Sequence, residues 1–214
     1  MTIPRGTSLS LIEHYALYLL GMVRSDYTYN MIDPSKPLAL GVGQFQGIDA
    51  HTILTMIDDD IDETLPTEIQ LELTTQPIGW WDIRFPDKDE ANELIAQFST
   101  SNIGELQHDF WKWKAEFYTP LLESCGFDST EHPREYIFAL ILLQINPHAG
   151  CEVFRNAAGT SELEKLFTAS INNEQFYLLW ERIEFAYLIL NSWNASSTPP
   201  NPTNIYPLLD EGGD

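Results

Sequence analysis

Basic residues are scarce in this chain. Its 214 residues include 11 Lys and Arg against 32 Asp and Glu, which gives a formal net charge of −21. Because no basic patch offsets this charge, the phosphates of nucleic acid and the headgroups of an anionic membrane would be repelled. We therefore expect no nucleic-acid partner and no membrane partner. The acidity suits a solvated surface, and it would also suit a protein that mimics nucleic acid or steers a basic partner.

Cysteine is rare as well, with Cys125 and Cys151 the two thiols of the chain. Their spacing forms neither a CxxC nor a metal-binding motif, and the five His show no HExxH or Cys/His cluster. The sequence thus predicts no metal site and no cofactor. Each Cys is expected to be a buried small apolar residue. A disulfide is the alternative if the protein matures outside the cell.

Long hydrophobic runs are also missing, and none approaches the ~20 residues of a membrane span. Residues 1–6 carry one Arg, and the apolar run from Leu9 to Val23 is interrupted by Glu13 and His14. No signal peptide is therefore predicted, and we expect synthesis in the cytosol of the producing host. A role at a cell wall would require release by lysis or transport on a virus particle.

Apolar residues nevertheless make up 43% of the chain, with 6 Trp, 9 Tyr and 11 Phe, which is typical of a folded protein with a core. Ser10 and Glu13 form a capping box that predicts a helix ending near Asp26. A Pro-containing loop follows through Leu40. Asp49 is a predicted N-cap for a second helix. Residues 67–75 alternate in a way that fits either a strand or a short helix.

Further helices are expected along the rest of the chain. Their predicted ranges are 90–98, 102–121, 133–146, a short stretch from residue 161 through 167, and 173–193. In the second of these, Phe110, Trp113 and Phe117 share one face and are expected in the core. The fold class predicted is all-α, with one short hairpin at most.

The composition changes after Trp193. Residues 194–214 are rich in Ser, Pro, Asn and Gly, which is typical of a C-terminal tail. We expect one helical domain over residues 1–193 and a tail over residues 194–214. Tyr206, Leu208 and Leu209 are the predicted anchors by which this tail docks.

The most informative stretch lies between the first two predicted helices. The first helix ends in Val23-Arg24-Ser25-Asp26-Tyr27, and the second follows Gly41-Val42-Gly43-Gln44-Phe45-Gln46. This layout resembles the active-site core of the lysozyme-like superfamily, which includes phage tail-associated lysozymes and lytic transglycosylases. In that superfamily a Glu-Ser pair closes the first helix, and a Gly-x-x-Gln-like segment follows. Here Ser25 matches, while Arg24 stands in the place of the catalytic Glu.

The resemblance implies a site for peptidoglycan glycan strands. Glycoside cleavage needs a carboxyl group to protonate the leaving oxygen, and a guanidinium group cannot do so. Three interpretations remain open: Asp26 or Glu13 supplies the acid, the domain is a retired hydrolase in which Arg24 binds glycan, or the resemblance is accidental. The implied substrate-binding residues are Arg24, Ser25, Tyr27, Tyr29, Gly43, Gln44, Gln46 and Gln144.

These observations lead to two functional hypotheses from different classes. The first, implied by the resemblance, is a phage tail- or lysis-associated protein that binds the glycan strands of peptidoglycan. This hypothesis has two versions, one in which the protein only binds the strands and one in which it also cleaves them. Its expected partners are peptidoglycan and the proteins of a virion or other assembly. The second is a catalytically inactive structural or adaptor protein of a phage tail or another large assembly, or an acidic inhibitor. A tail that docks weakly favours membership of an assembly.

Overall fold

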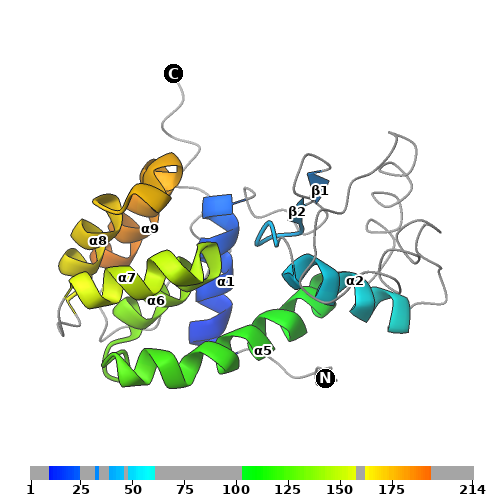
Figure 1. The fold of residues 1–214 in the computed structure, drawn as a ribbon. Helices are drawn as coiled ribbons and strands as arrows, with labels where there is room; N and C mark the ends of the chain where they lie inside the picture. Colours follow the sequence, from blue (N-terminus) through cyan, green and yellow to red (C-terminus); the bar gives the residue numbers. More distant parts are fainter. Residues whose placement is uncertain are drawn as a thin grey trace. The chain divides into compact units, whose positions relative to one another are not determined.

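A computed structural model describes residues 10–24, 32–33, 39–45, 48–60, 103–157 and 162–193. These residues form an all-α fold with one short hairpin, as the sequence predicts (Figure 1). The elements in chain order are α1 (Leu11–Arg24), β1 (Ile32–Asp33), β2 (Ala39–Leu40), α2 (Ile48–Asp60), α5 (Ile103–Ser124), α6 (Pro133–Ile145), α7 (Pro147–Asn156), α8 (Leu163–Ile171), the 3-10 helix η1 (Glu174–Leu179) and α9 (Trp180–Ser192).

The chain divides into two compact units. One comprises residues 1–8 and 24–113, and the other comprises residues 9–23 and 114–214. The first unit contains the hairpin, in which Ile32 of β1 lies opposite Leu40 of β2, together with α2 and the first half of α5. The second contains nearly all of α1, the second half of α5 and the helices α6 to α9.

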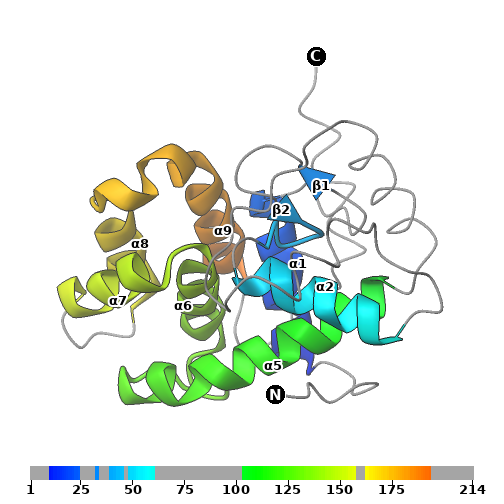
Figure 2. The same cartoon turned by 45° about the vertical axis from the view of Figure 1, so that its right-hand side comes forward.

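Helix α6 is the core helix of the second unit. Every residue from Glu135 to Leu143 is buried, because the helix is apolar on all sides and α7, α8 and α9 all contact it (Figure 2). Helix α1 is likewise buried on all sides from Tyr15 to Leu20. The Tyr15 ring packs against Trp193 at the end of α9, with 5.8 Å between ring centroids.

Most of the predicted helix boundaries agree with the structure. The Ser10–Glu13 capping box begins α1, and Pro133 is in the first turn of α6, which ends before Asn146. Helix α2 begins at Ile48, so Asp49 lies in its first turn rather than at the N-cap. The segment that starts at Asn173 opens as the 3-10 helix η1 and becomes α-helical only at Trp180.

The structure also differs from the sequence-based expectations at α7 and on α5. The Asn146-Pro147 pair follows the end of α6, as the sequence predicts, but Pro147 is also the first residue of α7, a helix that the sequence analysis does not expect. On α5 the predicted core residue Phe110 is fully buried, whereas Trp113 is only partly buried and Phe117 is 66% exposed. Trp111, which the sequence analysis does not place in the core, is fully buried.

The ranges 67–75, 90–98 and 194–214 lie outside the described residues, so the strand, helix and docked tail expected there stay predictions. Across the described helices, none is both long and apolar enough to cross a membrane. Cys125 and Cys151 are free thiols that are each partly exposed, so neither is the fully buried residue that the sequence predicts.

Candidate functional site

Glu13 is engaged in capping at the start of α1. Its carboxylate Oε2 accepts a hydrogen bond from the Ser10 backbone N–H at 2.9 Å, and its own N–H donates to Ser10 Oγ at 3.2 Å. This is the reciprocal geometry of a capping box. Arg24 ends the same helix eleven residues later, which is roughly 16 Å along the axis at about 1.5 Å per residue. Glu13 thus stabilises the helix end that is remote from the predicted catalytic position.

Arg24 is the last residue of α1, so the helix ends where the resemblance places the catalytic acid. Ser25, Asp26, Tyr27, Tyr29 and Gln46 lie outside the described residues, and their roles stay predictions.

The glycine segment folds into a tight four-residue turn closed by Leu40 and Phe45. The two residues exchange backbone hydrogen bonds, with the Leu40 N–H donating to Phe45 O at 2.9 Å and the Phe45 N–H to Leu40 O at 2.8 Å. Gly41 has φ of +67° and Gln44 has φ of +46°, both in the left-handed region. The Gln44 side chain stabilises the turn, since its Nε2 donates to Gly41 O at 3.1 Å.

The side chain of Gln107 on α5 forms a hydrogen bond with the backbone of this turn. Its side chain is fully buried, and its Oε1 accepts a hydrogen bond from the Val42 N–H at 2.8 Å. A Cβ at Gly41 would collide with the same amide group. Sequence reasoning missed Gln107. The available signal was an amide on the apolar face of a helix, between Leu106 and Phe110.

Gly43 leaves room for the Phe45 ring of the same turn. A Cβ there would collide with the Phe45 ring, which packs edge-on against Phe110 of α5 with 5.0 Å between centroids. All residues from Leu40 to Phe45 are buried. Within the described residues, Gly43 and Gln44 are therefore used in folding and packing the turn. Contact of either residue with a glycan stays a prediction.

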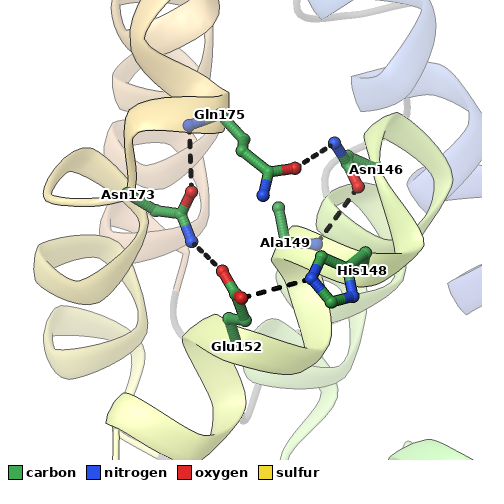
Figure 3. Close-up of polar contacts among 6 residues, drawn as sticks. All are labelled: Asn146, His148, Ala149, Glu152, Asn173 and Gln175. Atoms are coloured by element: carbon green, nitrogen blue, oxygen red, sulfur yellow. Dashed lines mark hydrogen bonds and ion pairs between the residues drawn. The ribbon is translucent and has the colours of Figure 1, made fainter.

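Gln144 lies in the second unit, near the end of α6. Two residues later in the chain, Asn146 belongs to a polar cluster (Figure 3). In that cluster Asn146 Oδ1 accepts from the Ala149 N–H at 3.1 Å, and Asn146 Nδ2 donates to Gln175 Oε1 at 2.8 Å. The Asn146 side chain therefore caps the following helix, α7, while its backbone N–H donates to the Leu142 carbonyl at the end of α6. By the two-unit division, Gln144 and Glu13 fall in one unit and Gly43 and Gln44 in the other.

The same cluster joins α7 to η1. Asn173 Nδ2 donates to Glu152 Oε2 at 3.1 Å, while Asn173 Oδ1 accepts from the Gln175 N–H at 3.0 Å and caps η1. His148 Nε2 lies 3.2 Å from Glu152 Oε1. Figure 3 shows these side chains bridging the two elements. The arrangement is a set of caps and cross-links that positions η1.

The pKa values of Asp128, Tyr15 and Tyr136 are shifted from their ordinary values. Asp128 Oδ1 accepts hydrogen bonds from the Glu131 and Thr130 N–H groups, which lowers the pKa of its carboxyl group. A general acid requires the opposite direction. Burial raises the pKa of Tyr15 and of Tyr136 above the ordinary phenol value, so both hydroxyl groups stay protonated at neutral pH.

Metal-binding residues do not gather in the described ranges, where no three His, Cys, Asp or Glu side chains are close enough to share an ion. Comparisons with models of known protein families, with curated proteins and with solved structures found no match to this chain.

Proposed function

We propose that this protein binds the glycan strands of peptidoglycan, as a phage tail- or lysis-associated protein of the lysozyme-like type. The supporting observation is the order of the elements after α1. The helix ends at Arg24, the hairpin follows, and a tight glycine turn at Gly41–Gln44 leads into α2. This is the order of helix end, glycine segment and second helix on which the resemblance depends. Arg24, the glycine turn and α2 fall in one unit, while the rest of α1 falls in the other.

Binding is assigned to the region around the end of α1. Arg24 supplies donors for sugar hydroxyls or for the carboxylates of a peptide stem. Tyr27 and Tyr29 supply rings that stack on sugars. Gln44 and Gly43 contribute through the shape of the turn, because the Gln44 amide is bonded within it. In the version of the proposal in which the protein also cleaves the glycan strand, Asp26 is the catalytic acid. Glu13 is not chosen because its carboxylate is engaged in capping at the other end of α1.

The test is co-sedimentation with purified Gram-positive cell walls, followed by analysis of released muropeptides. Arg24→Ala should weaken sedimentation by about tenfold, the cost of one charge-assisted contact of about 1.4 kcal/mol. Asp26→Asn should abolish any release. Glu13→Gln is the matched carboxylate control, because Gln also completes a capping box, and both binding and release should survive it.

Each outcome has a distinct meaning for the two hypotheses. Binding without release, with release gained in Arg24→Glu, identifies a retired hydrolase that has kept its glycan site. A wild-type protein that neither sediments with walls nor releases muropeptides overturns the proposal. The alternative then stands, a structural or adaptor protein of a phage tail or another large assembly.

A further inference from the structure

Three large apolar side chains are exposed where η1 meets α9. Tyr177 is 70% exposed, Leu178 is 92% exposed and Trp180 is 44% exposed. Their neighbour Phe176 is fully buried and anchors η1 to the core of the second unit. Clustered exposure of large apolar groups is typical of an interaction surface, whereas isolated exposed apolar residues are common. We call these three residues the η1 ridge.

The backbone that carries the η1 ridge is held in place. Tyr177 and Leu178 lie in η1, and Trp180 is the first residue of α9. Asn173 caps η1 and bonds Glu152, and Gln175 accepts from Asn146, so two side chains fasten the start of η1 to α7 (Figure 3). A held surface loses little conformational freedom on binding, which favours affinity.

Acidic side chains outnumber basic ones in the segment that carries the η1 ridge. Between residues 174 and 193 the chain has Glu174, Glu181 and Glu184 against the single basic residue Arg182. The side chains of Glu174, Glu181 and Arg182 are exposed. The whole chain carries a net charge of −21. A partner that brings positive charge to this surface therefore gains Coulomb energy in addition to apolar burial.

The same charges disfavour other occupants. A second copy of the chain would place the same glutamates against one another. Residues 194–214 contain Asp210, Glu211 and Asp214 and no Lys or Arg, so the C-terminal segment is also repelled. An anionic membrane surface is repelled for the same reason.

We propose that the η1 ridge docks a cationic amphipathic helical segment of a partner protein. Apolar side chains of that segment pack on Tyr177, Leu178 and Trp180, while its Lys or Arg side chains face the surrounding glutamates. Aromatic residues at the centre of a charged rim have the composition of an interaction hot spot. The η1 ridge falls in the second unit, whereas Arg24, Gly43 and Gln44 fall in the first.

The experiment measures binding of a fluorescein-labelled Lys/Leu amphipathic peptide of about five helical turns to the full chain by anisotropy. Leu178→Ser should weaken binding by about tenfold or more, as expected for a central contact. Phe117→Ser is the matched control, since Phe117 is also an exposed apolar residue, on α5, and affinity should change by less than about twofold. Binding should also weaken as salt rises from about 0.05 M to about 0.5 M.

Four results would overturn the proposal. The first is an equal loss of affinity in Leu178→Ser and Phe117→Ser, or no loss in either. The second is equal binding of a peptide in which Glu replaces Lys. The third is self-association of the chain in sedimentation that Leu178→Ser abolishes, which would make a second copy the occupant. The fourth is tighter peptide binding in the full chain carrying Leu208→Ser, which would make the C-terminal segment the occupant. Far-UV circular dichroism of each variant checks that the fold is retained.

Discussion

At the scale of single residues, the glycine turn shows how a sequence motif can have a structural cause. The resemblance to lysozyme-like proteins implies that Gly43 and Gln44 contact a glycan. In the structure a glutamine amide lies against Gly41, and the Phe45 ring lies against Gly43. The glycines are therefore required by packing within the protein, whatever binds outside it.

Substitutions at Gly41 and Gln107 should be coupled. Gly41→Ala adds a Cβ at positive φ and against the Gln107 amide, so we expect a loss of about 2–4 kcal/mol in the free energy of unfolding. Gln107→Ala leaves the buried Val42 N–H without this acceptor, at about 1–3 kcal/mol. The double variant should lose less unfolding free energy than the sum of the two single losses. Without the Gln107 amide, the new Cβ at position 41 has nothing to collide with, and only the strain of the positive φ remains. Urea unfolding of the four proteins measures this, and strict additivity would contradict it.

Two buried tyrosines should respond oppositely to removal of their hydroxyl groups. Among the described residues, the Tyr15 hydroxyl has no hydrogen-bond partner, while the Tyr136 hydroxyl lies 3.0 Å from Thr119 Oγ. Tyr15→Phe should therefore be neutral or stabilising by up to about 1 kcal/mol, and Tyr136→Phe should destabilise by about 1 kcal/mol. The two variants are matched controls in one urea titration. A larger loss in Tyr15→Phe than in Tyr136→Phe would refute the assignment.

At the scale of elements, the start of α7 depends on one side chain with two bonds. Asn146 accepts from the Ala149 N–H and donates to Gln175. Asn146→Ala should cost about 1–2 kcal/mol, because both bonds are lost. Asn146→Asp keeps the cap and should cost less, since the Gln175 amide can rotate to donate to the new carboxylate. Thermal melts of the three proteins test this order, and an Asp variant as unstable as the Ala variant would contradict it.

The turn that leads into α6 should be sensitive to acid. Hydrogen bonds from Glu131 and Thr130 lower the pKa of Asp128 from its ordinary value of 3.8. Since the folded-state pKa is the lower one, the stabilisation is present above the ordinary value and is lost as pH falls through the folded-state pKa. The Tm difference between wild type and Asp128→Asn should therefore be larger at neutral pH than below the folded-state pKa. A difference that grows on acidification would mean that the sign is wrong.

At the scale of the whole molecule, the net charge of −21 is the dominant property. Self-repulsion of this size destabilises the compact state. Raising sodium chloride from about 0.01 M to about 0.5 M should screen it and raise Tm, with each 1 kcal/mol relieved worth about 2–4 °C. Scanning calorimetry measures the shift, with an uncharged osmolyte of equal osmolality as control. A Tm that falls with salt would show that attractive ion pairs outweigh the repulsion.

Sequence patterns predicted the helices best where a cap or a proline marked their ends. Ser10, Pro133 and Asn173 are examples, because each acts on the backbone within three residues. The pattern failed at α7, where the same Asn146-Pro147 pair that stops α6 also starts the next helix. On α5 it was right at Phe110, which is fully buried, and wrong at Phe117, which is exposed, because periodicity does not show where along a helix the packing partner ends.

The sequence by itself determined the all-α class, the acidic character and most helix starts, because these follow from composition and from contacts between near neighbours in the chain. Only the tertiary structure decided the use of the glycine turn, the burial of Trp111 and the exposure of Leu178. Each of these depends on contacts between segments far apart in sequence. Val42 and Gln107, for example, are 65 residues apart and joined by one hydrogen bond that no local pattern encodes.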